Sequence, residues 1–156
     1  MELARNLKVE SIGRLRLGPA VCLPRHASVS EAVDQMRQRR VGGVLICDAK
    51  ARLVGVFTER DLLRRVLVKQ LPLITPLERC MTAPVQTASP TEPVGVAVQR
   101  MQEGGYRHLP VVDTQGRPVG MLSSRVIVHY LVEHFPATIY CLPPDPDVRS
   151  SRREGA

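Results

Sequence analysis

The stretch Leu53-Val-Gly-Val-Phe-Thr-Glu-Arg-Asp-Leu62 returns 65 residues later as Pro118-Val-Gly-Met-Leu-Ser-Ser-Arg-Val-Ile127. Each copy begins with a short apolar run and continues into a polar segment, which predicts a buried strand leading into a helix. The match extends without a gap from residues 12–63 to residues 77–128, and 11 of the 52 aligned pairs are identical. Such an internal repeat decides the architecture, because each copy is expected to fold as the same small unit.

Outward from this stretch, the two copies show the same order of elements. Ser28 precedes Glu31 by three residues, the spacing of a helix capping box, and apolar residues follow at helical spacing. Short apolar runs bounded by turn residues then predict two buried strands and a closing helix. The predicted strands are 20–23, 44–47 and 53–58 in the first copy and 85–87, 109–112 and 118–123 in the second, with closing helices at 59–68 and 125–134. We therefore expect an α/β (α+β) fold of two tandem βαββα repeats packed sheet to sheet.

The repeats divide the chain into four segments. We expect repeat one with its lead-in segment at 9–68, a linker at 69–76 and repeat two at 77–135. Residues 136–156 are predicted to be a Pro-rich extended arm, for which 141–146 is the clearest stretch, followed by a disordered basic tail.

Composition indicates a globular, intracellular protein. Hydrophobic residues make up 44% of the 156, and no apolar run approaches the roughly 20 residues of a membrane helix. The four cysteines, Cys22, Cys47, Cys80 and Cys141, are scattered, so we interpret them as reduced thiols in a cytoplasmic protein. A formal net charge of +7 suits an anionic partner, whether nucleotide phosphate, nucleic acid or an acidic protein surface.

Three stretches carry a family resemblance. Residues 53–62, the segment Gly105-Tyr-Arg-His-Leu-Pro-Val-Val-Asp113 and the segment Leu77-Glu-Arg-Cys-Met-Thr-Ala-Pro-Val85 resemble the most recognisable parts of CBS domains, and the likeness covers about residues 9–133. The resemblance implies a Bateman module, in which two repeats related by pseudo-two-fold symmetry form two nucleotide clefts. It also implies a homodimer, a regulatory rather than catalytic role, and ligands such as AMP, ADP, ATP, S-adenosylmethionine or NAD.

The first cleft is predicted around Thr58 and Asp61. Thr58 ends a predicted strand and Asp61 follows three residues later, in the first turn of a helix. A carboxylate can accept hydrogen bonds from the two vicinal hydroxyls of a ribose. The resemblance implies that Asp61 binds the ribose and Thr58 a phosphate or ribose oxygen. The alternative is that both residues merely cap the helix, because Thr-x-x-Asp is common at helix starts.

Basic residues are expected to line the same cleft. By resemblance to AMP-sensing members of the family, Arg107 and His108 reach ligand phosphates across the pseudo-dyad, and Arg60 and its counterpart Arg125 lie near the rim. These cations would favour an anionic nucleotide over S-adenosylmethionine, whose sulfonium is positive. The alternatives are solvated surface charges for the arginines and a structural role for His108.

The adenine ring is expected beside the first core strand of repeat one. The expected contacts are backbone and apolar groups that allow a flat ring to approach closely: Val41, Gly42, Gly43 and Pro110. The two glycines could equally mark a kink or tight packing.

Repeat two departs from this pattern. Ser123 matches Thr58, but Val126 replaces Asp61 and cannot bind a ribose hydroxyl. We therefore expect one working site per chain and at most a weaker second site at Ser123.

No motif in the sequence indicates catalysis or a metal site. The prediction is a module that senses an adenine nucleotide and signals to an effector protein that the sequence does not identify. Two alternatives stay open: an adaptor that dimerises without a ligand, and a nucleic-acid-binding protein whose basic runs at 37–40 and 149–153 contact phosphates.

Overall fold

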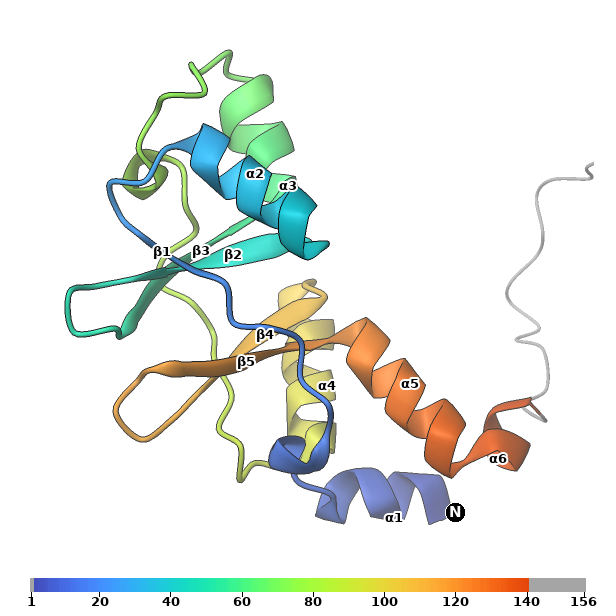
Figure 1. Cartoon of the computed structure of the whole chain (residues 1–156). Helices are drawn as coiled ribbons and strands as arrows, with labels where there is room; N and C mark the ends of the chain where they lie inside the picture. The colour runs from blue at the N-terminus through green and yellow to red at the C-terminus, as the bar shows by residue number, and fades with distance from the viewer. Residues whose placement is uncertain (1, 141–156) are drawn as a thin grey trace, which may run out of the picture.

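The computed structural model describes residues 2–140, and Figure 1 shows two stacked units of strands and helices. In chain order the elements are α1 (Glu2–Val9), η1 (Ile12–Arg14), β1 (Cys22–Pro24), α2 (Val29–Arg39), β2 (Gly43–Cys47), β3 (Leu53–Thr58), α3 (Glu59–Asp61), η2 (Leu62–Leu67), η3 (Leu77–Arg79), α4 (Val94–Gly104), β4 (His108–Val112), β5 (Pro118–Ser123), α5 (Ser124–His134) and α6 (Pro136–Tyr140).

The two hairpins have equivalent register, which confirms the repeat. In the first, β2 and β3 are antiparallel with Gly43 opposite Thr58; in the second, β4 and β5 are antiparallel with His108 opposite Ser123. Each pair of partners is related to the other by the same 65-residue offset. The sheets face each other across the middle of the molecule, and both hairpin turns project to the same side (Figure 1).

The first strand differs between the repeats. The strand predicted at 20–23 is present as β1, at residues 22–24, and pairs in parallel with β2, but the predicted strand at 85–87 is wrong. Only Ala88 pairs with β4, through an isolated bridge to Val111. The two further bridges that β1 makes need backbone N–H donors at the positions of Pro110 and Pro90, and proline has none, which leaves only this bridge.

The helices follow the predicted caps. The Ser28 side chain accepts from the Glu31 backbone N–H, and Glu31 accepts from the Ser28 backbone, which completes the capping box of α2. The closing helix of repeat one begins where predicted and ends at Leu67, one residue before the predicted end, and its second part, η2, winds as a π-helix from Leu62. Its counterpart α5 is a regular α-helix that starts one residue earlier than predicted.

Each lead-in segment completes the core of the other repeat. Ile12 and Leu15, in the first lead-in (residues 10–21), belong to the hydrophobic cluster of repeat two. Leu77 and Cys80, at the equivalent positions of the second lead-in (residues 75–86), belong to the cluster of repeat one. Apart from the missing strand at 85–87, the predicted order of strands and helices holds, but neither repeat is a self-contained unit.

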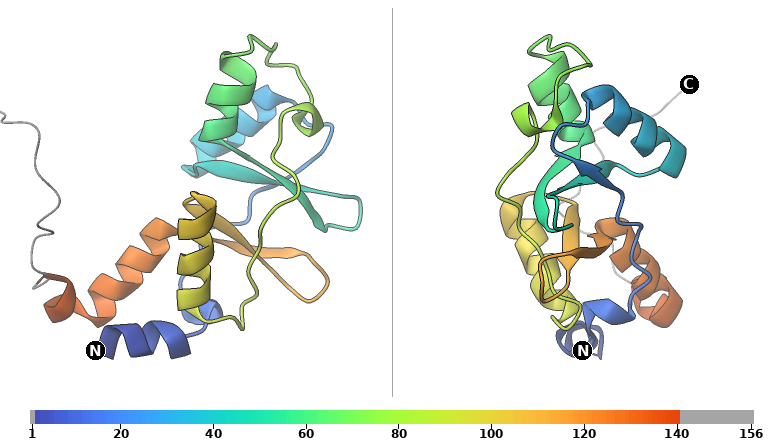
Figure 2. Two further views of the ribbon diagram at one scale, coloured as in Figure 1. Left: turned by 180° about the vertical axis from the view of Figure 1, so that it is seen from behind. Right: turned by 60° about the vertical axis from the view of Figure 1, so that its left-hand side comes forward.

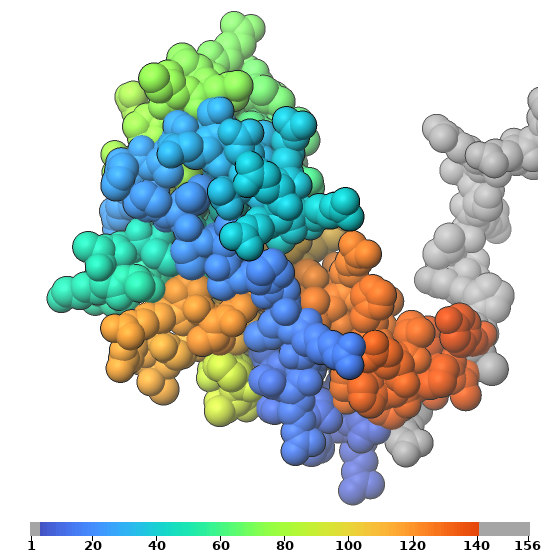
Figure 3. All heavy atoms as spheres, viewed as in Figure 1, coloured from blue at the N-terminus to red at the C-terminus, as the bar shows by residue number. Residues whose placement is uncertain are grey.

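Backbone hydrogen bonds show how this exchange is built. Val94 N–H donates to Glu10 C=O at 2.9 Å, and 65 positions apart Val29 N–H donates to Thr75 C=O at 3.0 Å. The first lead-in crosses between the units on the face shown in Figures 1 and 3, and the second crosses on the opposite face (Figure 2). Two crossings on opposite faces are the arrangement expected of a pseudo-two-fold axis.

The crossings also explain one identical pair in the repeat. Gly55 in β3 lies under the Met81 side chain, so that a Cβ at position 55 would overlap the sulfur. Gly120 in β5 lies under Leu17, whose Cβ would be 2.8 Å from a Cβ at position 120. Each glycine thus makes room for the opposite lead-in.

Two terminal elements were not predicted. Helix α1 packs against α4, and Gly95 of α4 allows close approach because a Cβ there would be 3.1 Å from the Leu7 carbonyl oxygen. The segment predicted as an extended arm begins instead with α6, which contacts α5. The six residues after Pro136 contain no proline, which allows this helical turn, and the Pro-rich stretch at 141–146 lies outside the described residues.

Candidate nucleotide site

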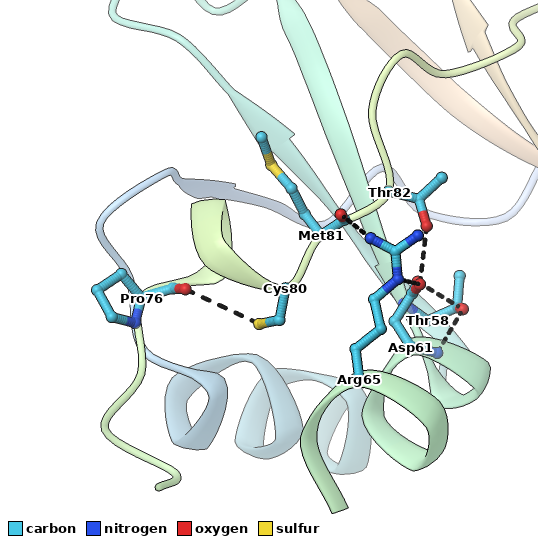
Figure 4. Close-up of polar contacts among 7 residues, drawn as sticks. All are labelled: Thr58, Asp61, Arg65, Pro76, Cys80, Met81 and Thr82. Atoms are coloured by element: carbon cyan, nitrogen blue, oxygen red, sulfur yellow. Dashed lines mark hydrogen bonds and ion pairs between the residues drawn. The ribbon is translucent and has the colours of Figure 1, made fainter. Parts of the chain in front are cut away.

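Thr58 and Asp61 form a reciprocal cap at the start of α3 (Figure 4). Thr58 donates from its backbone N–H and its hydroxyl to Asp61 Oδ2, both at 2.9 Å, and the Asp61 N–H donates to Thr58 Oγ1 at 3.4 Å. The Asp61 residue is only 6% exposed. The structure therefore brings the two predicted site residues together, in the capping geometry that was the alternative to ligand binding.

Two further donors contact the same carboxylate. The Thr82 hydroxyl, from the second lead-in, donates to Asp61 Oδ1 at 2.7 Å. Arg65 Nε, one helical turn after Asp61, lies 3.3 Å from the same oxygen, and its guanidinium also donates to the Met81 carbonyl at 2.6 Å. Figure 4 shows the Arg65 guanidinium between the Asp61 carboxylate and the Met81 carbonyl. Asp61 is thus bound to both repeats.

His108 makes a second contact between the repeats. Its imidazole lies against Gly42, close enough that a Cβ at position 42 would be 3.3 Å from Cε1 and 3.7 Å from a carboxylate oxygen of Glu59. Burial lowers the pKa of His108, partly opposed by Glu59, and Arg107 lowers it further. A neutral imidazole is therefore favoured near pH 7.

The predicted arginines lie at the surface. Arg60 donates to the Gly105 carbonyl of repeat two at 3.1 Å, which spans the junction. Arg107 and Arg125 are exposed, and neither forms an ion pair within residues 2–140. Both residues are thus accessible to an anion in solvent.

The predicted adenine contacts divide by burial. Val41, Gly42 and Gly43 are half-buried at the end of α2 and the start of β2, and the Gly42 carbonyl accepts from the Glu59 N–H at 3.1 Å. Pro110 is buried in the middle of β4. Gly42 and Gly43 thus lie beside the start of α3, whereas Pro110 is covered by the protein itself.

Repeat two repeats the cap without its carboxylate. The Ser123 hydroxyl accepts from the Val126 N–H at 3.2 Å, but the Val126 side chain packs on the cluster of repeat two. The position equivalent to Thr82 is Leu17, and the position equivalent to Arg65 is Tyr130. The polar cluster around Asp61 therefore has no equivalent in repeat two.

Sequence reasoning missed three members of the site. Arg65 lies four residues after Asp61, a spacing that predicts an ion pair on a helix and could have identified it. Glu59 precedes Arg60 at the helix start, but only the fold brings it near His108. No local signal connects Thr82 to Asp61, because their contact joins residues 21 apart across the two repeats.

A depression of about 410 Å³ lies in repeat two, away from Asp61, between the segment 85–89, Glu92, Arg100 and the 112–114 turn. In residues 2–140 no three His, Cys, Asp or Glu side chains gather as a metal site would require. None of the helices in that range has both the length and the apolar character needed to cross a membrane.

Comparison with known proteins identifies the family. The CBS domain model matches the chain twice, at residues 12–68 and 77–133. The chain therefore belongs to the CBS domain family and contains two tandem CBS repeats, as the sequence resemblance indicated.

Individual relatives agree with this assignment. The CBS domain-containing protein CBSCBSPB5 of Arabidopsis thaliana is 40% identical over 114 residues, which are 72% of this chain but only 20% of that protein. A CBS domain protein from Pyrobaculum aerophilum, solved in complex with AMP, superposes with a TM-score of 0.71 at 31% identity and covers 80% of this chain and 99% of its own. The CBS domain pair of protein MJ0100, solved with 5′-methylthioadenosine and S-adenosyl-L-methionine, gives 0.73 at 25% identity over 80% and 98%.

Proposed function

We propose that this chain is a regulatory module that binds an adenine nucleotide, AMP, ADP or ATP, beside Asp61, without catalysis, and passes a conformational change to a separate effector protein. The observation that carries the proposal is the pairing of Thr58 and Asp61 at the start of α3, at the junction of the two repeats. Adenine-containing ligands in two solved relatives support the ligand class.

The chemistry of the site suits a ribose and a phosphate. The Asp61 carboxylate accepts hydrogen bonds, as a ribose diol requires, and the exposed Arg60, Arg107 and Arg125 supply positive charge for phosphate oxygens. The formal net charge of +7 favours an anionic nucleotide over the positive sulfonium of S-adenosylmethionine. Because Val126 replaces the carboxylate in repeat two, we propose one nucleotide per chain.

A thermal-shift titration with AMP, ADP, ATP, NAD and S-adenosylmethionine tests the proposal. A ligand at a hundredfold excess over its Kd adds about 2.7 kcal/mol of stability, which raises the melting temperature of a chain of this size by several degrees. We expect a shift with at least one of AMP, ADP and ATP that is lost in Asp61→Asn. Asp34→Asn, which removes an exposed carboxylate from α2, is the matched control and should keep the shift.

The contrary outcomes are distinct. No shift with any of the five ligands contradicts the sensor and favours an adaptor. Binding to DNA or RNA that falls steeply with salt and survives Asp61→Asn would favour a nucleic-acid-binding protein instead.

The proposal extends to assembly and location. Helices α4 and α5 border a largely apolar depression of about 310 Å³ that includes Met101, Tyr106 and the exposed Val128, and we propose that a homodimer buries this face. Light scattering on the purified protein should then give twice the chain mass of 17.3 kDa.

We also propose a cytoplasmic location, because the free thiols of Cys22, Cys47 and Cys80 suit the reducing cytoplasm.

A further inference from the structure

The Asp61 carboxylate is fully engaged by groups of the protein. Oδ2 accepts from the Thr58 N–H and hydroxyl at 2.9 Å each, and Oδ1 accepts from the Thr82 hydroxyl at 2.7 Å with Arg65 Nε at 3.3 Å. A carboxylate offers about four lone-pair positions. A ribose diol can therefore reach Asp61 only by displacing a donor that is already present.

The four donors differ in how readily they can leave. The two from Thr58 belong to the cap and lie within three residues of Asp61, so releasing them would open the start of the helix. The Thr82 hydroxyl and the Arg65 guanidinium reach Oδ1 from outside the cap, and Arg65 is an exposed residue. The Oδ1 donors are thus the ones that a ligand hydroxyl can replace at least cost.

The same two donors hold the second lead-in against repeat one. Arg65 donates to the Met81 carbonyl at 2.6 Å, and Thr82 exchanges two backbone hydrogen bonds with Val56 at 2.8 and 3.0 Å. Beyond Thr82 the chain continues to Ala88, which is hydrogen-bonded to β4 of repeat two. A change at Oδ1 of Asp61 therefore has a continuous covalent route into repeat two.

We propose that Asp61, Arg65 and Thr82 form a latch that competes with the ribose for Asp61. Nucleotide binding then releases residues 81–82 from Asp61 and Arg65 in the closing helix of repeat one (α3 and η2). This inference rests on the proposed function and names how the ligand signal leaves the site. The latch is one-sided, because repeat two has Val126, Tyr130 and Leu17 at the three equivalent positions.

The variant Thr82→Val tests the latch, because valine matches threonine in shape but has no hydroxyl. Wild type and variant are titrated with AMP, ADP and ATP by calorimetry. In wild type the ligand must break the hydrogen bond from Thr82 to Asp61, and Thr82→Val lacks that bond. The variant should therefore bind the nucleotide about 2- to 10-fold more tightly than wild type. Arg65→Gln should also raise it, whereas Arg64→Gln removes the same charge from the exposed neighbour of Arg65 and should not.

Hydrogen exchange gives a readout that does not depend on affinity. In wild type, a saturating nucleotide should accelerate exchange in the peptide that contains the Thr82 amide, which donates to the Val56 carbonyl, while the helix start at 59–61 becomes more protected. Thr82→Val should show a smaller nucleotide-induced change, because its hydroxyl contact is already absent.

The outcomes separate the latch from the proposed function. If wild type binds a nucleotide and Thr82→Val binds it equally or more weakly, Thr82 is a spectator or a ligand contact, and the latch is wrong. Protection of residues 81–82 by the nucleotide contradicts it in the same way. If wild type and every variant bind none of the three nucleotides, the proposed function fails, and the latch as a ligand gate fails with it.

Discussion

Gly42 of repeat one lies against the imidazole of His108 of repeat two. A Cβ at residue 42 would be 3.3 Å from His108 Cε1, which is tighter than ordinary van der Waals contact, and 3.4 Å from Nε2, at the lower limit of such contact. This contact joins the predicted adenine surface to the predicted phosphate-binding residues.

Gly42→Val should therefore displace His108 and weaken nucleotide binding. A branched side chain forced into a filled space costs about 1–3 kcal/mol of stability. Calorimetric titration should show at least a severalfold loss of affinity, with Gly42→Ala intermediate because the imidazole has to move by only a few tenths of an ångström. Unchanged affinity in Gly42→Val would place the adenine elsewhere.

His108 should make the free energy of unfolding depend on pH in mildly acidic solution. Burial lowers its pKa in the folded protein below the ordinary value of about 6.5, so the unfolded chain binds more protons just below that pH. Stability should then fall as the pH drops from 7 through the interval between the unfolded and folded pKa values.

Urea unfolding at pH 7.5 and pH 5.5 measures this effect against His108→Gln. The variant should lose less stability than wild type over the interval. Carboxylates with lowered pKa values, such as Glu92 beside Arg100, lose their stabilising contribution only at lower pH, because their unfolded pKa is near 4.3. Equal losses in both proteins would show that His108 is solvated.

Leu77→Ala should destabilise the protein by about 2–5 kcal/mol, the usual cost of removing a large aliphatic side chain from a core. Leu77 is 0% exposed and fills the cluster of repeat one although it lies in the second lead-in. Chemical denaturation provides the measurement. Leu73→Ala, at a residue that is 51% exposed in the linker, should change stability by no more than about 0.5 kcal/mol.

The thiols should differ in reactivity. Burial, and then the neighbouring Cys22, raise the pKa of Cys47 to about 12, and burial raises the pKa of Cys80. Because the thiolate is the nucleophile, iodoacetamide at pH 8 should modify the exposed Cys22 well before Cys47 or Cys80. Peptide mass spectrometry of a Cys141→Ser variant would follow the three sites, and rapid labelling of Cys80 would contradict its burial.

The elements were predictable because the signals were local and occurred twice. The apolar runs at 44–47 and 109–112 and the box at Ser28 each specify an element from neighbouring residues, and the 65-residue offset confirms them. The Thr58–Asp61 pair is local in the same sense. Thr82 on Asp61 and His108 on Gly42 are not, because each contact depends on where the lead-ins and the second hairpin lie in space.

The same distinction explains the wrong predictions. A strand is predicted at 85–87 as at 20–23, but Pro90 and Pro110 lack the N–H groups that its pairing with β4 needs, and only a single bridge forms. Helix α1 has no repeat partner, and its packing on α4 follows from a close approach at Gly95 that no periodicity reveals.

The exchange of lead-ins has a consequence for synthesis on the ribosome. When residues 12–68 have emerged, the cluster around Phe57 still lacks Leu77 and Cys80, while Ile12 and Leu15 have no cluster to join until β4 and β5 follow. The first repeat therefore keeps apolar surface exposed until the second lead-in has been synthesised. Chaperone demand during translation should peak between the two repeats, and a stop codon in the linker should leave a fragment that is degraded rather than a functional half.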